Sequence, residues 1–124
     1  MKPRKTHHKS TLRALARIAY ERELKSTLSI LAAKFDNWKM GKVTSFEMEE
    51  LVHKYDCDES RKLWSLYNSS SDHSIVARAV ASGLLSEEEV GTTIIKLLTE
   101  QIAFFQEGNH KNSSDSVENK QSAA

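Results

Sequence analysis

The sequence contains few residues that interrupt regular structure, with one proline and four glycines among its 124 residues. An all-β domain needs a turn about every 8 to 12 residues, and turns are rich in these two residue types. So low a content of turn-forming residues argues against a β-sandwich or barrel and favours long helices.

Cysteine and long apolar runs are equally scarce. The only cysteine is Cys57, so no disulfide within the chain and no cysteine-based metal cage is expected. No run approaches the roughly 18 apolar residues that a membrane span requires. No apolar segment follows the first basic residues, which argues against a secretory signal. These absences predict a cytoplasmic protein with a reduced thiol.

Charge is nearly balanced overall, with a formal net charge of +1, but it is unevenly distributed. No acidic residue occurs before Glu21, whereas residues 86–108 are rich in glutamate. The molecule is therefore expected to be positive at its start and negative near its end. The basic residues that precede Glu21 are Lys2, Arg4, Lys5, Lys9, Arg13 and Arg17.

Polarity divides the chain into three parts. Residues 1–9 lack apolar anchors and are predicted to be a disordered basic arm. Residues 10–108 carry regular apolar spacing and are predicted to form one helical domain. Residues 109–124 are polar with a lone valine, too little apolar surface to offset the entropy of ordering, and are predicted to be a disordered tail.

The first predicted helix covers residues 10–40, because no proline or glycine interrupts this run. Its apolar residues recur at intervals of three and four, which places them on one helix face. We therefore expect this face to enter the core of an all-α fold, a small bundle of about five helices with a long N-terminal helix. The residues of this face are Leu24, Leu28, Leu31, Phe35 and Trp38.

A second helix is predicted over residues 45–55. Thr44 and Glu47 have the spacing of a capping box, in which each side chain accepts a hydrogen bond from the other residue's backbone. Phe46 and its apolar neighbours on this helix are expected to be partly buried. A third helix, capped by Asp56 or Asp58, is predicted to follow.

Two more helices are predicted in the second half of the chain. Residues 73–82 are apolar nearly all round, which is typical of a central, buried helix that ends at Gly83. Ser86 and Glu89 repeat the capping-box spacing, and the fifth helix is predicted to continue to residue 106. Gly91 is expected only to loosen its first turn, at a cost of up to ~1 kcal/mol relative to alanine.

Candidate catalytic groups are sparse. Glu50 and His53 have the Glu-x-x-His spacing of carboxylate-bridged di-metal bundles, but such a site needs a second copy, which the sequence lacks. Cys57 lies between Asp56 and Asp58, whose negative charge disfavours a reactive thiolate, although a helix N-terminus would favour it. There is no phosphate-binding glycine loop. The sequence therefore predicts neither an enzyme nor a bound metal or cofactor.

Two groups of charged residues could nevertheless form binding sites. Lys2, Arg4, Lys5, Lys9, Arg13 and Arg17 could contact phosphates of a nucleic acid, since each contact releases counterions. Arg78 is a charge within the apolar fourth helix and needs a carboxylate partner there. Alternatively it could form an anion-binding polar cluster with His53 and Arg61.

Three phrases of the sequence, FDNWKMGKVTSFEMEELVHKY, SRKLWSLY and VARAVASGLLSEEEV, resemble short helical bacterial hypothetical proteins. The resemblance covers residues 35–90 in part. It implies a bacterial cytoplasmic setting, no particular activity and no site residues.

Taken together, these features predict a non-enzymatic interaction or regulatory protein that acts through a helical surface. A protein partner or self-association is expected, and a membrane partner is not. The alternative is a nucleic-acid-associated protein that uses the basic N-terminal residues.

Overall fold

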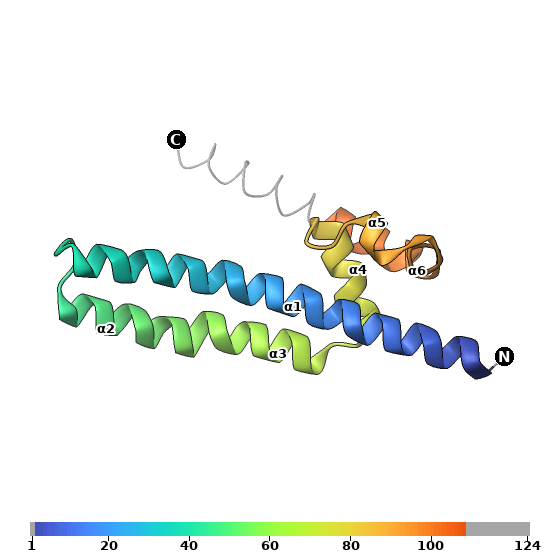
Figure 1. The fold of residues 1–124 in the computed structure, drawn as a ribbon, viewed down its shortest axis with the longest axis horizontal. Coiled ribbons are helices and arrows are strands. Elements are labelled where there is room, and N and C mark those ends of the chain that lie inside the picture. Colours follow the sequence, from blue (N-terminus) through green and yellow to red (C-terminus); the bar gives the residue numbers. More distant parts are fainter. Residues whose placement is uncertain (1, 109–124) are drawn as a thin grey trace. The chain divides into compact units, whose positions relative to one another are not determined.

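The computed structural model of this chain describes the backbone of residues 2–108 and the side chains from His8 onward. All described elements are helices, with no strand among residues 2–108 (Figure 1), so the predicted all-α fold is confirmed. The tail predicted over residues 109–124 lies outside the described residues. The chain divides into two compact units, one formed by Tyr20–Ser70 and the other by the residues on either side of it.

The first helix is longer than the sequence predicted. α1 (Lys2–Lys39) begins at Lys2 rather than at Ser10, so the backbone of the predicted arm is helical from that residue. Pro3 does not oppose this start, because the first turn of a helix needs no backbone donor at that position. α1 runs through both units without a break, and the single domain predicted over residues 10–108 stays a prediction.

A glycine ends α1 and starts the turn of a helical hairpin. Gly41 has φ 78°, the left-handed conformation that a side chain disfavours. Its N–H donates to the Trp38 carbonyl over 3.0 Å, and the Lys42 N–H donates to the Asn37 carbonyl over 2.9 Å. This pair of hydrogen bonds is the Schellman motif, which satisfies the last carbonyls of the helix.

The return arm of the hairpin is continuous. α2 (Ser45–Lys54) begins at the predicted capping box of Thr44 and Glu47, which is confirmed. It leads directly into the π-helix η1 (Tyr55–Ser60) and then α3 (Arg61–Ser69), which runs back beside α1 (Figure 1). The caps predicted at Asp56 and Asp58 are wrong, because the backbone stays helical there and the chain never leaves the rod.

The π-helix corrects the register of this rod. Tyr55 and Leu63 both face α1, yet eight residues of α-helix turn by about 800°, which would leave them about 80° apart. A π turn holds more residues per turn than an α turn and so absorbs one extra residue. Leu63 is therefore buried, and the Tyr55 hydroxyl reaches Thr27 of α1.

The other unit contains α4 (Asp72–Ser82), which begins after the N-cap Ser71 and ends at Gly83 in the left-handed conformation. The Ser71 hydroxyl accepts a hydrogen bond from the Ser74 N–H over 3.2 Å. Five residues of this one helix are buried, which confirms that it is the most buried element. These residues are Ile75, Val76, Ala77, Ala79 and Val80.

The predicted fifth helix over residues 87–106 is wrong as a continuous element. The Ser86–Glu89 capping box is present, but α5 (Glu87–Val90) ends at Gly91, and α6 (Thr92–Leu97) begins immediately after it. Gly91 has φ 93° and ψ 151°, a region essentially restricted to glycine, so it turns the chain rather than loosening a helix. Leu98 then interrupts the helix again before residues 99–108.

Burial is unequal between the two units. Of sixteen buried apolar residues in the described chain, only Met48 and Leu63 belong to the hairpin unit Tyr20–Ser70. The remaining fourteen lie in the other unit, which therefore has a conventional core. The core residues of that unit are Leu12, Leu15, Ala16, Ala19, Ile75, Val76, Ala77, Ala79, Val80, Leu85, Val90, Ile94, Leu98 and Ile102.

Candidate functional site

Hydrogen bonds fix the alignment of the two hairpin arms. Near the turn, the Trp38 indole Nε1–H donates to the Ser45 hydroxyl over 3.0 Å. Midway along the hairpin, the Thr27 and Tyr55 hydroxyls lie 3.4 Å apart. Each bond joins one arm to the other, so Lys39 lies level with the start of α2, and the residues just before Thr27 lie level with η1.

The open end of the hairpin is held by aromatic and polar contacts. Tyr67 of α3 stacks on Tyr20 of α1 with ring centroids 4.4 Å apart. The Tyr67 hydroxyl also donates a hydrogen bond of 2.5 Å to the Glu23 carboxylate. Polar or aromatic contacts thus join the two arms near the turn, in the middle and at the open end of the hairpin.

These contacts determine which flank of α1 each neighbouring residue occupies. Each residue turns an α-helix by about 100°, so Leu28 is rotated by that amount from the inward-facing Thr27. Phe35 follows Leu28 by seven residues and lies on the same flank. Ile30 is rotated by about 200° from Leu28 and lies on the other flank.

The return arm presents apolar residues on the same side as Leu28. Trp64 is rotated by about 100° from the buried Leu63. Val52 is rotated in the same sense, by about 40° from the buried Met48. In antiparallel helices, equal rotations away from the contact line lead to the same face of the pair. We call this surface the apolar hairpin face; its residues are Leu24, Leu28, Phe35, Val52 and Trp64.

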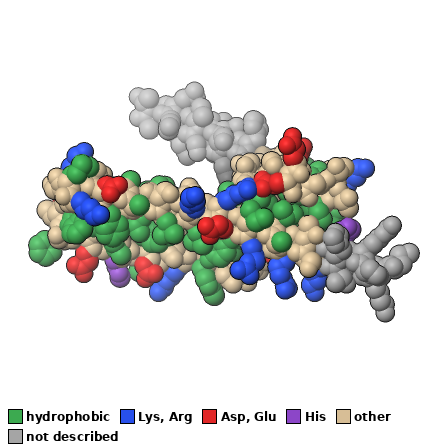
Figure 2. All heavy atoms as spheres, viewed as in Figure 1, with side chains coloured by type: hydrophobic (Ala, Val, Ile, Leu, Met, Phe, Trp, Pro, Cys, Tyr) green, Lys and Arg blue, Asp and Glu red, His purple; other side chains and the backbone are tan. Residues whose placement is uncertain are grey.

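The apolar hairpin face is open to solvent. Leu28 is 48% exposed, Val52 38% and Trp64 62%. Figure 2 shows hydrophobic side chains gathered along the hairpin on the face turned to the viewer. More broadly, seven of the ten exposed large apolar side chains in the described chain belong to the hairpin. These seven are Leu28, Ile30, Trp38, Met40, Phe46, Val52 and Trp64.

The opposite flank of the hairpin has a different character. Ile30 borders a shallow depression there together with charged residues of both arms, including Lys34, Lys54, Asp58 and Glu59. Leu31 and Leu51 line the same depression, so Ile30 has both charged and apolar neighbours. This flank of the hairpin therefore mixes charged and apolar side chains.

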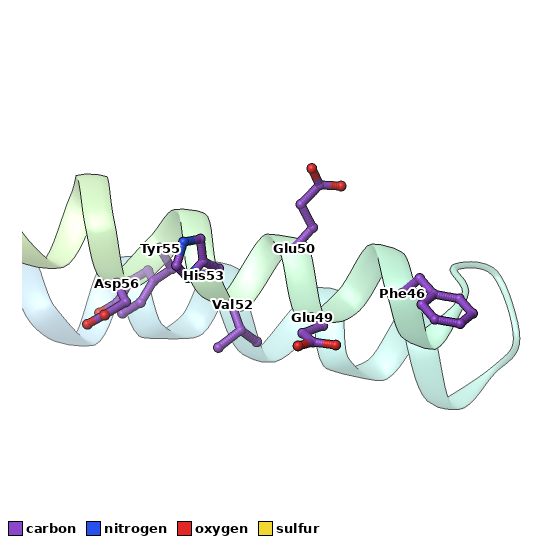
Figure 3. A pocket seen from close by; sticks show the side chains of 7 residues that line it. All are labelled: Phe46, Glu49, Glu50, Val52, His53, Tyr55 and Asp56. Atoms are coloured by element: carbon purple, nitrogen blue, oxygen red, sulfur yellow. The ribbon is translucent and has the colours of Figure 1, made fainter.

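A larger depression lies on α2 and η1, with a volume of about 690 Å³. Its lining includes Val52 of the apolar hairpin face, and Phe46 lies at one end (Figure 3). The other lining residues are Glu49, Glu50, His53, Tyr55 and Asp56. Phe46 is 86% exposed, so its predicted partial burial is wrong: it points away from α1, on the outer side of α2. Carboxylates without a lining lysine or arginine make this depression attractive to cations.

The basic residues of α1 form a regular row where their side chains are described. Lys9, Arg13 and Arg17 are exposed and follow one another at intervals of four residues on one helix. Such spacing places them along one side of α1. Lys2, Arg4 and Lys5 have a helical backbone, and their side chains lie outside the described part of the chain.

The polar cluster predicted from His53, Arg61 and Arg78 is distributed over both units. His53 and Arg61 are exposed in the hairpin, and Arg78 is half-buried in α4 of the other unit. His53 contacts Cys57 instead, with Nε2 3.7 Å from Sγ. The cluster stays a prediction. Among the described side chains, no group of three histidine, cysteine or carboxylate residues is placed to hold a metal ion.

Sequence reasoning assigned the Leu24–Trp38 face to a core and so missed the apolar hairpin face. The spacing of apolar residues is the same whether a face is covered by the same chain or by another molecule. The sequence held no signal that separates these two cases.

In comparisons with protein-family models, curated proteins and solved structures, no match to this chain was found. Within residues 2–108, no helix combines the length and apolar character needed to span a membrane.

Proposed function

We propose that this protein is a non-enzymatic interaction protein of the bacterial cytoplasm that binds a protein through its apolar hairpin face. The observation that carries the proposal is the exposure of Leu28, Val52 and Trp64 on a single face, while the other unit buries most of its apolar residues. Large contiguous apolar surfaces on folded proteins are typical of interaction sites.

The free energy available on this face supports binding. A tryptophan contributes 150–250 Å² of surface, so the exposed part of Trp64 represents roughly 3 kcal/mol of hydrophobic free energy at ~25 cal/mol per Å². Tryptophan is also the residue type most enriched at the energetic centres of interfaces. Trp64 is therefore expected to be the anchor of the contact.

Site-specific photo-crosslinking in cells tests this function. A photoreactive residue at position 28 is expected to give a covalent protein adduct, because this position lies on the apolar hairpin face. The same residue at position 30 is the matched control, since Ile30 is 54% exposed on the same helix but on the opposite flank. Equal adduct yields at both positions, or none at position 28, would refute the proposal.

Nucleic-acid binding is the second candidate, and the row of Lys9, Arg13 and Arg17 favours it. A row on one side of a helix can follow a phosphate backbone, and each contact adds to the salt dependence of affinity. Replacing each residue with alanine is expected to lower the slope of log K against log salt by about 1 per residue. Lys42→Ala, in the hairpin turn, is the control, and an unchanged slope in the Arg13 and Arg17 variants would exclude this function.

A further inference from the structure

We infer that the occupant of the apolar hairpin face is the same face of a second copy of this chain, so that two hairpins form a four-helix bundle. The inference rests on the proposed function and specifies its partner. It is carried by three observations: the small core of the hairpin, the shape of its exposed face and the placement of charge along its edges.

The first observation is that the hairpin lacks a core of its own. Its 51 residues, Tyr20–Ser70, bury only Met48 and Leu63 among the described side chains. Units of this size are marginal even when they are well packed, and oligomerisation is a common solution. A second hairpin would cover the exposed apolar face, because two hairpins with two helical arms each make a four-helix bundle.

The second observation is that the face is suited to pairing with itself. Leu28 and Phe35 lie on one arm, and Val52 and Trp64 lie on the other, so apolar residues occur on both arms along the hairpin. A two-fold axis parallel to the arms places α1 of one copy against α2, η1 and α3 of the other. Neighbouring helices are then antiparallel throughout, as in most four-helix bundles.

The third observation is complementary charge at the edges of the face. On α1 the outer edge carries Lys25 and Lys39, and on the return arm it carries Glu49 and Asp56; all four are exposed. The hydrogen bonds that align the arms place Lys39 within about two turns of Glu49 in height, and Lys25 level with Asp56. In the two-fold arrangement Lys25 therefore lies level with Asp56 of the other copy, and Lys39 lies within about two turns of its Glu49.

The exposed apolar surface of the hairpin face is consistent with a stable dimer. Trp64 alone leaves on the order of 100 Å² uncovered, since a tryptophan contributes 150–250 Å² and 62% of Trp64 is exposed; Leu28 and Val52 add to this area. A standard interface buries about 800 Å² per partner, roughly 65% of it apolar in homodimers. The face thus supplies a substantial part of the apolar surface that such an interface requires.

Sedimentation equilibrium of the full chain tests the inference. The wild-type protein is expected to approach twice its mass of 14.0 kDa as concentration rises. Leu28→Lys is expected to raise the dimer dissociation constant at least about tenfold, whereas Ile30→Lys leaves it nearly unchanged. Circular dichroism checks that both variants remain helical. An equal rise of the dimer dissociation constant in the two variants would contradict the inference.

A charge exchange tests the arrangement itself. Lys25→Glu is expected to weaken association roughly fivefold by placing two carboxylates together, and Asp56→Lys in the same chain is expected to restore it. Failure of the double variant to recover would reject the two-fold arrangement.

The same experiments separate the inference from the proposed function. A protein that sediments at 14.0 kDa at every concentration, yet gives adducts with another protein from position 28, overturns the second copy and retains the interaction function. A monomer that gives no adduct from position 28 overturns both.

Discussion

Tyr20 and Tyr67 stack almost parallel, with ring planes 3° apart, although 46 residues of chain separate them. They close the open end of the hairpin opposite its glycine turn. The stack leaves the Tyr67 hydroxyl free to donate to Glu23, so one side chain contributes both a ring contact and a charge-assisted hydrogen bond.

Two substitutions at Tyr67 separate these contributions. Tyr67→Phe keeps the stack and removes the hydrogen bond to Glu23, which is expected to lower the free energy of unfolding by about 1 kcal/mol. Tyr67→Leu also removes the ring contact and is expected to cost about 1 kcal/mol more. Urea denaturation followed by circular dichroism measures both, and two variants as stable as the wild type would show that this end of the hairpin is not held by Tyr67.

The π-helix predicts an unusual tolerance to deletion. Removal of Asp58 from η1 lets the rod continue as regular α-helix with Tyr55 and Leu63 still facing α1, so stability is expected to stay equal or rise. Removal of Ser65 instead rotates Tyr67 by about 100° relative to Leu63, and we expect it to destabilise the hairpin. Thermal unfolding measures the stability of both deletion variants. A deletion of Asp58 that destabilises the hairpin more than the deletion of Ser65 would disprove the register argument.

The break at Gly91 is expected to be more sensitive to substitution than the helix end at Gly83. A Cβ meets no atom within 4 Å at either site, so the cost is conformational rather than steric. Gly91→Ala is expected to cost about 2 kcal/mol, because its φ and ψ are nearly exclusive to glycine. Gly83→Ala, in the ordinary left-handed region, is expected to cost about 1 kcal/mol. Chemical denaturation measures the free energy of unfolding of both variants, and a larger loss in Gly83→Ala than in Gly91→Ala would contradict this expectation.

The capping box at the start of α2 predicts a pH dependence. Hydrogen bonds from the backbone N–H and then the hydroxyl of Thr44 lower the pKa of the Glu47 carboxyl below its ordinary value. Because the folded-state pKa is the lower one, this stabilisation is complete above the unfolded-state pKa of about 4.3. It is lost as the pH falls through the folded-state pKa.

Carbon-13 titration of the Glu47 carboxyl measures this directly. Thr44→Ala keeps the backbone N–H, which is the larger cause, and removes only the hydroxyl, so the pKa of Glu47 is expected to rise only part of the way to its ordinary value. The loss of the cap is expected to weaken the helix start by about 1 kcal/mol. Thr44→Ser keeps the hydroxyl and serves as the control. An unchanged Glu47 pKa in the alanine variant would show that the Thr44 hydroxyl does not lower it.

Local signals in the sequence predicted much of this fold. The Thr44–Glu47 and Ser86–Glu89 boxes act over three residues, and both helix starts are where the sequence placed them. The break at Gly91 was missed because glycine is compatible with a helix as well as with a turn, and only tertiary context decides between them. The π-helix was missed although the shift in apolar spacing between Tyr55 and Leu63 marks it.

The candidate site was harder to predict for a physical reason. Apolar periodicity identifies a face that needs covering, and it does not say which molecule covers it. Leu28 and Leu12 belong to the same helix and the same residue type, yet Leu12 is 1% exposed and Leu28 is 48% exposed. The difference arises from the number of elements that surround each one, which is a property of the folded chain.

Fluorescence of Trp64 tests the central claim most directly. The chain has two tryptophans, so Trp38→Phe leaves Trp64 as the only reporter on the apolar hairpin face. Acrylamide quenching is expected to be weak at high protein concentration and to rise on dilution, as the second copy leaves Trp64 exposed. Quenching that stays at the level of a freely exposed indole at every concentration would contradict the account.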